Sequence, residues 1–72
     1  LKAERASLGE VIRARRDACG MTQELVAQKL GVSRQAVGKW ESGKSEPSTT
    51  NLMALAELFG TDAAELLREV KR

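Results

Sequence analysis

Apolar positions along the 72-residue chain recur at helical spacing within short segments, which glycines and capping residues separate. The first segment shows these signals most fully. Ser7 and Glu10 have the spacing of a capping box, and Gly20 can take the left-handed conformation that ends a helix. The same signals along the whole chain predict five helices and no strand, with caps at Ser7, Thr22, Ser33, Ser48 and Asp62.

A very tight turn separates the second and third predicted helices. Gly31 ends the second helix because it adopts a positive φ without steric cost, and Ser33 caps the next helix only two residues later. Two helices that cross over so short a turn need a small residue where their backbones approach, and Ala27 is that residue. This pattern over residues 23–41 is typical of a helix-turn-helix. The side chains expected in its core are Val26, Leu30, Val32, Val37 and Trp40.

The remaining segments complete one compact core. Residues 42–48, SGKSEPS, favour turns and predict the longest loop. The fourth helix ends at Gly60, and the fifth, which Asp62 and Glu65 open with the spacing of a second capping box, extends through Val70. We expect an N-terminal extension over residues 1–7 and one domain over 8–70. Three further residues, Met21, Met53 and Phe59, are expected in the core or at its margin.

Charge favours a nucleic-acid partner only through its distribution. The net charge is +2, from 12 Lys and Arg against 10 Asp and Glu, which by itself is too small to indicate nucleic acid. Between Arg13 and Lys44, however, basic residues outnumber acidic ones, whereas half of the acidic residues lie from Glu46 onward. We therefore expect a basic face on the first two-thirds of the chain.

Several classes of site are disfavoured by composition. Histidine is absent, and Cys19 is the single cysteine. A lone thiol without a neighbouring base offers neither a disulfide nor a nucleophile, and the acidic residues lack metal-ligand spacing. We expect no enzyme activity, no metal and no cofactor. Apolar runs fall far short of the roughly 20 residues that span a bilayer, and no leader pattern is visible, so we expect a cytoplasmic protein without a membrane segment.

Nearly the whole chain, from Leu8 to Leu67, carries a recognisable set of motifs. They are LGEVIRARR, the TQ pair at 22–23, VAQKLGVSRQAV, WESGK, EPS and LMALAELFG. In these the chain resembles the XRE-type helix-turn-helix domains of phage repressor and Cro proteins. The resemblance implies an all-α, compact five-helix, lambda-repressor-like domain whose third helix lies in the major groove of DNA, with homodimers that bind two-fold operators.

The resemblance also implies roles for individual residues. Arg34, Gln35 and Lys39 match the positions whose side chains contact base edges. Their chemistry agrees, since Arg can bind guanine O6 and N7 and Gln can bind adenine N6 and N7, while Lys39 lies one helical turn after Gln35 on the same face. Gln23 matches a glutamine that meets the DNA backbone and braces the base-contacting side chain. The residues expected at the DNA backbone are Thr22, Gln23, Ser33, Ser42, Lys44 and Arg13.

One matching pair is structural. Arg16 and Glu41 match a largely buried ion pair that joins the first helix to the end of the third. Three positions depart from the family pattern. Ser42 stands where asparagine is common, so a backbone contact is made by serine or is lost, and Leu25 replaces a polar residue. Arg15 replaces an apolar one, which predicts a less buried first helix and additional charge toward phosphates.

Two functions are consistent with the sequence. The first is a sequence-specific DNA-binding transcription regulator, a repressor that acts as a homodimer on double-stranded DNA and takes no small-molecule ligand in this domain. Its dimer surface would be the last helix, with Leu67 and Val70, or the loop after Glu41. The alternative is a protein-interaction module on the same scaffold, which would use Leu25 or one of the last two helices. Arg34, Gln35 and Lys39 favour the first, because an interaction module more often presents apolar anchors.

Overall fold

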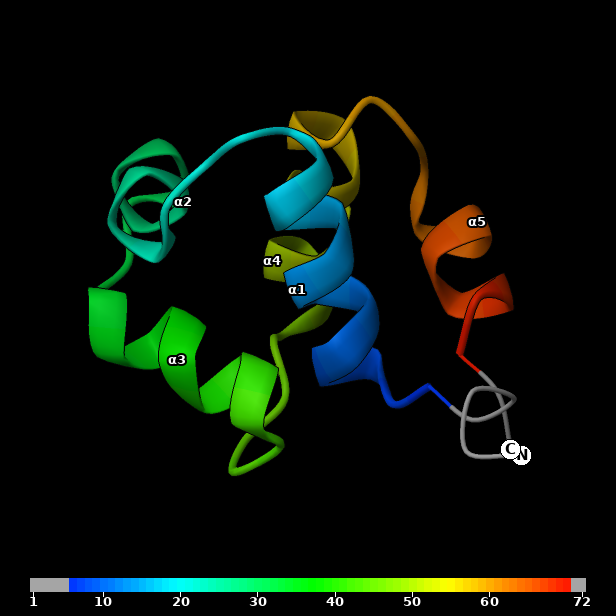
Figure 1. Cartoon of the computed structure of the whole chain (residues 1–72), viewed down its shortest axis with the longest axis horizontal. Coiled ribbons are helices and arrows are strands. Elements are labelled where there is room, and N and C mark those ends of the chain that lie inside the picture. Colours follow the sequence, from blue (N-terminus) through cyan, green and yellow to red (C-terminus); the bar gives the residue numbers. More distant parts are fainter. Residues whose placement is uncertain (1–5, 71–72) are drawn as a thin grey trace.

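The computed structural model describes residues 6–70, and in this part of the chain it contains five helices and no strand. In Figure 1, α1 and α4 lie at the centre, α2 and α3 lie together on one side, and α5 lies on the other. The predicted all-α class is therefore confirmed. Most of the expected extension, residues 1–5, lies outside the described residues. The bounds are α1 Leu8–Ala18, α2 Gln23–Leu30, α3 Arg34–Ser42, α4 Thr49–Leu58 and α5 Ala63–Arg68.

Side-chain caps begin all five helices at the residues predicted. The Ser7 hydroxyl accepts a hydrogen bond from the Glu10 N–H, and the Glu10 carboxylate accepts one from the Ser7 N–H, so the capping box is complete. Asp62 accepts from the Glu65 N–H, but the Glu65 carboxylate pairs with Arg68 at 3.3 Å, so only half of the second box forms. Because a cap satisfies a free N–H within one turn, these helix starts are determined locally.

The tight turns depend on two glycines in the left-handed region. Gly31 ends α2 with φ 73°, and Gly43 ends α3 with φ 84°. The expected requirement for positive φ at Gly31 is thus confirmed. Both residues let the chain change direction within a few positions, which holds α2 against α3 and turns the chain out of α3 toward α4.

A third glycine is required for a different reason, and the sequence patterns did not single it out. Gly9 lies in α1 where this helix crosses the end of α3. A Cβ atom added there would lie 2.5 Å from the carbonyl oxygens of both Trp40 and Glu41. Only glycine therefore allows α1 to approach the α3 backbone this closely.

The core consists of apolar side chains from all five helices. Leu30 and Val32, expected inside, are partly buried at its edge. Val70 also packs against the core, but α5 ends at Arg68, two residues earlier than expected. Met53 is 59% exposed, so its expected place in or beside the core is wrong. The buried residues are Val11, Ile12, Val26, Ala27, Val37, Trp40, Leu55, Ala56, Phe59 and Leu66. None of the helices described between residues 6 and 70 is both long enough and apolar enough to cross a membrane.

Candidate nucleic-acid interface

Helix α3 presents three polar side chains to solvent. Arg34, Gln35 and Lys39 are all exposed, whereas Val37 and Trp40 on the opposite side of the helix are buried. Ser33 caps the helix by accepting a hydrogen bond from the Ala36 N–H at 3.1 Å. The apolar side therefore fixes the helix in place while the polar side is left free for a ligand.

The first residues of α2 and α3 lie close together. Arg34 donates a hydrogen bond from Nη1 to Oε1 of Gln23 at 3.2 Å. Gln23 is the first residue of α2, and Thr22 caps that helix by accepting from the Leu25 N–H. The two helix N-termini thus meet at one edge of the molecule, where free N–H groups and a guanidinium together favour an anion.

A buried ion pair lies behind this edge. Arg16 Nε donates to Glu41 Oε2 at 2.7 Å and Nη2 donates to Oε1 at 3.1 Å, while the two side chains are 12% and 5% exposed. Arg16 also donates to the Met21 carbonyl at 2.8 Å and lies 3.3 Å from Asp17. The hydrogen bond to Glu41 raises the pKa of Arg16, an effect that burial partly opposes. The expected link between α1 and the end of α3 is present.

Gln23 connects the ion pair to the exposed face. Its Nε2 donates to Glu41 Oε1 at 3.0 Å, in addition to the bond that its Oε1 accepts from Arg34. The ion pair and the brace on Arg34 were expected separately from the sequence, but their connection through Gln23 was not. A residue spacing of 18 between Gln23 and Glu41 carries no local signal that could have predicted it.

The end of α3 and the loop after it carry the next two candidate residues, Ser42 and Lys44. The Ser42 hydroxyl donates to the Lys39 carbonyl at 3.2 Å, so its hydrogen is already engaged. Lys44 is exposed in the loop. Of the two, Lys44 is the one whose donors are directed to solvent, and its ammonium can approach a phosphate without breaking an internal contact.

A family model described as helix-turn-helix matches residues 12–66, which include all of α2, α3 and α4. The chain belongs to the XRE-type helix-turn-helix family. In this family's terms α2, Gly31 and α3 are the helix-turn-helix unit. The site described above is the exposed side of that unit.

Members of the helix-turn-helix family with curated names are similar over most of the chain. The transcriptional activator BcrR of Enterococcus faecalis is 40% identical over 81% of this chain and 28% of its own length. Repressor protein C2 of Salmonella phage P22 is 36% identical over 85% of the chain and likewise 28% of its own length. The chain thus spans little more than a quarter of either relative.

A solved structure of the P22 c2 repressor in complex with a synthetic operator has the same fold. It superposes with a TM-score of 0.82 at 34% sequence identity and covers 89% of this chain and 97% of the solved one. The five-helix arrangement is therefore that of a phage repressor domain.

The arginines of α1 are less free than the sequence suggested. Arg13 is 69% exposed, with Nε 3.9 Å from Asp17. Arg15 instead donates to Glu69, just after α5, through Nε at 3.3 Å and through Nη2. This hydrogen bond lowers the pKa of Glu69, against the effect of burial, and raises the pKa of Arg15. Arg15 is therefore engaged by Glu69, and its expected contribution of charge toward phosphates stays a prediction.

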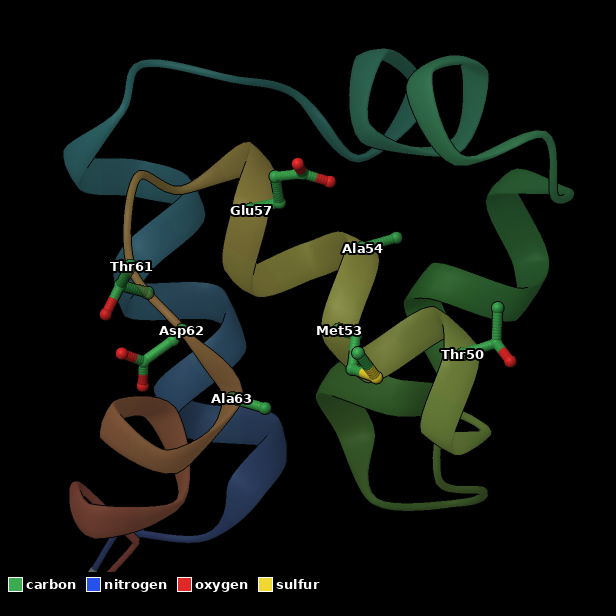
Figure 2. Close-up of a pocket in the computed structure, with 7 residues that line it drawn as sticks. All are labelled: Thr50, Met53, Ala54, Glu57, Thr61, Asp62 and Ala63. Atoms are coloured by element: carbon green, nitrogen blue, oxygen red, sulfur yellow. The ribbon is translucent and has the colours of Figure 1, made fainter.

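A groove of about 610 Å³ lies away from the helix-turn-helix unit, between α4 and the start of α5 (Figure 2). Figure 2 shows Thr50, Met53, Ala54 and Glu57 along α4, with the linker and first residue of α5 opposite. Two of its lining residues are acidic and none is basic. This face is therefore unsuited to phosphate. The lining residues are Thr50, Met53, Ala54, Glu57, Thr61, Asp62 and Ala63.

Proposed function

We propose that this domain is the DNA-binding part of a transcriptional repressor, and that α3 enters the major groove of double-stranded DNA. The observation that supports this most directly is the outward-facing set of Arg34, Gln35 and Lys39, in which Gln23 holds Arg34. The similarity to the P22 c2 repressor and its operator complex supports the same docking. A cytoplasmic location agrees with a DNA partner.

The three side chains have complementary chemistry for base edges. Arg34 would donate two hydrogen bonds to guanine O6 and N7, and Gln35 would donate to and accept from adenine. Each good two-bond contact discriminates against a wrong base by about 1 to 3 kcal/mol. Lys39, one turn further along, would extend the contact to a neighbouring base pair.

Phosphate contacts would flank α3 on both sides. The N-terminus of α2, with Thr22 and Gln23, would meet one phosphate through free N–H groups, and Lys44 would meet another. Arg13 would add positive charge, and the hydroxyl of Ser33 would donate a hydrogen bond to a phosphate oxygen. Ser42 contributes least, because its hydrogen is held by the Lys39 carbonyl.

Two copies would bind a two-fold operator. One short helix contacts about four or five base pairs, and two helices about 34 Å apart meet successive major grooves on one face of the duplex. Of the two expected dimer residues on the last segment, Leu67 is 50% exposed and Val70 packs against the core. On this segment Leu67 is therefore the dimer contact that we propose, with the loop after Glu41 as the other candidate surface. If Leu67 makes the contact, Leu67→Lys should be a monomer in analytical ultracentrifugation with unchanged helicity in circular dichroism.

The groove between α4 and α5 supports a second candidate, a protein-interaction module. Met53 is 59% exposed beside it, and Leu25 is 36% exposed on α2. We give this candidate the lower rank because the acidic groove and Leu25 lie on different elements and form no continuous apolar surface. No catalytic step is proposed for either function.

A salt titration against DNA separates the two candidates. An operator is first selected from a random duplex library, and affinity is then measured by fluorescence anisotropy as the salt concentration rises. DNA binding predicts that log affinity falls linearly with log salt, whereas a protein-interaction module predicts no DNA binding at all.

Single variants test the roles of the residues. Arg34→Ala should cost about 1 to 3 kcal/mol on the operator and little on random DNA. Lys29→Ala, which removes one positive charge from an exposed residue of α2 that lies beside Ala54 and Glu57 of α4, is the matched control and should leave both affinities near wild type. Equal losses on operator and random DNA for Arg34→Ala would show that Arg34 does not contact a base.

A further inference from the structure

Four polar side chains form a continuous hydrogen-bonded series from the interior to the exposed face of α3. The series starts at the buried ion pair, passes through the amide of Gln23 and ends at the guanidinium of Arg34. Its three steps measure 2.7 Å, 3.0 Å and 3.2 Å. In order, its members are Arg16, Glu41, Gln23 and Arg34.

The chemistry of these groups allows only one orientation of the central amide. The Glu41 carboxylate paired with Arg16 only accepts hydrogen bonds, and the guanidinium of Arg34 only donates them. The Gln23 amide has one accepting and one donating end, so its NH2 must face Glu41 and its oxygen must face residue 34. In the opposite orientation, oxygen would face carboxylate and NH2 would face guanidinium, so both hydrogen bonds would be lost.

The guanidinium of Arg34 is oriented in turn. Nη1 donates to Gln23 Oε1, which leaves the edge formed by Nε and Nη2 free. That edge carries two parallel N–H groups, the arrangement that matches guanine O6 and N7. A guanidinium held in this way loses less rotational freedom on binding than an unrestrained one.

We propose that Glu41 is a positioning residue for base recognition. It is 5% exposed and cannot itself reach DNA, but it fixes the orientation of the Gln23 amide and thereby the edge that Arg34 presents to a guanine. Position 34 consequently needs a hydrogen-bond donor as long as Glu41 and Gln23 are both present. The inference rests on the proposed function, since it concerns how the same face distinguishes bases.

The test measures base preference rather than affinity alone. The base pair that Arg34 contacts is identified first, as the position at which Arg34→Ala no longer distinguishes guanine from other bases. Base preference is then the affinity for the operator with guanine at this position divided by the affinity for an operator without it. Wild type, Gln23→Met, Glu41→Gln and the double variant are compared by fluorescence anisotropy. Gln28→Met, an exposed change on the same helix, is the control and should retain the wild-type preference.

We expect Gln23→Met and Glu41→Gln each to lower the preference for guanine about three- to tenfold, the range set by the loss of one hydrogen bond. The double variant should lose no more than Gln23→Met alone, because both changes break the same series. Full preference in either single variant, or multiplied losses in the double variant, would overturn the inference. If Glu41→Gln fails to fold, Glu41→Asp replaces it, because the shorter carboxylate keeps its charge for Arg16 but cannot also hold Gln23.

The proposed function and this inference fail in different ways. A wild-type protein without any base preference would overturn the proposed function, and the inference with it. A wild-type protein with a clear preference, beside variants with the same preference, would overturn the positioning role alone.

Discussion

Replacement of Arg16 by alanine should strongly destabilise this domain, because the change leaves a buried charge without its partner. In the structure Arg16 holds Glu41 through two hydrogen bonds and also satisfies the Met21 carbonyl, and the Glu41 side chain is only 5% exposed. In Arg16→Ala the carboxylate keeps a single hydrogen bond, from Gln23. The loss of one partner of a buried pair typically costs about 3 to 5 kcal/mol.

The expected loss is a large fraction of the free energy of unfolding of the whole domain. Stabilities of about 0.05 to 0.15 kcal/mol per residue give a chain of this length roughly 4 to 11 kcal/mol. Each kcal/mol shifts the melting temperature of a domain this small by about 4 to 8 °C, so Arg16→Ala should melt at least about 12 °C below wild type. Thermal unfolding followed by far-ultraviolet circular dichroism measures the shift.

Two further variants test whether the unpaired Glu41 carboxylate causes the loss of stability. Arg13→Ala removes the same charge from an exposed, 3.9 Å contact and should change the stability by less than about 0.5 kcal/mol. Arg16→Met with Glu41→Leu removes both charges and should melt well above Arg16→Ala, because an apolar pair leaves no stranded carboxylate. A melting temperature of Arg16→Ala close to wild type, or a double variant as unstable as the single one, would refute the reasoning.

Four other changes test separate features. Gly9→Ala places a Cβ 2.5 Å from two α3 carbonyl oxygens and should destabilise the domain by about 1 to 3 kcal/mol in chemical denaturation. Gly38→Ala, whose Cβ would have 3.8 Å of space, should instead stabilise α3 by about 0.5 to 1 kcal/mol in the same assay. Arg15 lowers the pKa of Glu69, so the stability that this ion pair adds is present above about pH 4.5 and is lost as the pH falls further. Melting temperatures of Glu69→Gln measured against pH should lack this loss. Lys44→Ala should weaken operator and random DNA alike and reduce the salt slope by about one in the anisotropy titration.

The four changes are expected to have different effects. Gly9→Ala lowers the stability, Gly38→Ala raises it, Glu69→Gln changes its pH dependence, and Lys44→Ala changes the affinity for DNA. Equal stability of Gly9→Ala and wild type would mean that α1 and α3 separate without cost. A Gly38→Ala variant less stable than wild type would mean that the glycine is needed by the fold. If Glu69→Gln loses stability at low pH as wild type does, Glu69 does not have the role assigned to it. If Lys44→Ala keeps the wild-type salt slope of DNA binding, Lys44 does not contact a phosphate.

The sequence by itself determined where each helix starts and which side of α3 faces outward. Caps such as Ser7 and Ser33 act on the N–H three residues later, and Gly31 acts on its own φ, so their effects are contained within one turn of chain. That Val37 is buried and Arg34 is exposed follows from helical periodicity, which is also local. The family resemblance added the Arg16–Glu41 pair.

The tertiary structure decided the contacts between residues far apart in the chain. The close approach at Gly9, the bond from Gln23 to Glu41 and the pairing of Arg15 with Glu69, 54 residues apart, all depend on the angles at which helices pack. The exposure of Met53 has the same origin, since helical spacing predicts an apolar face but not whether another helix covers it. Local rules fix each helix, but only packing determines which polar groups meet, and that meeting orients Arg34.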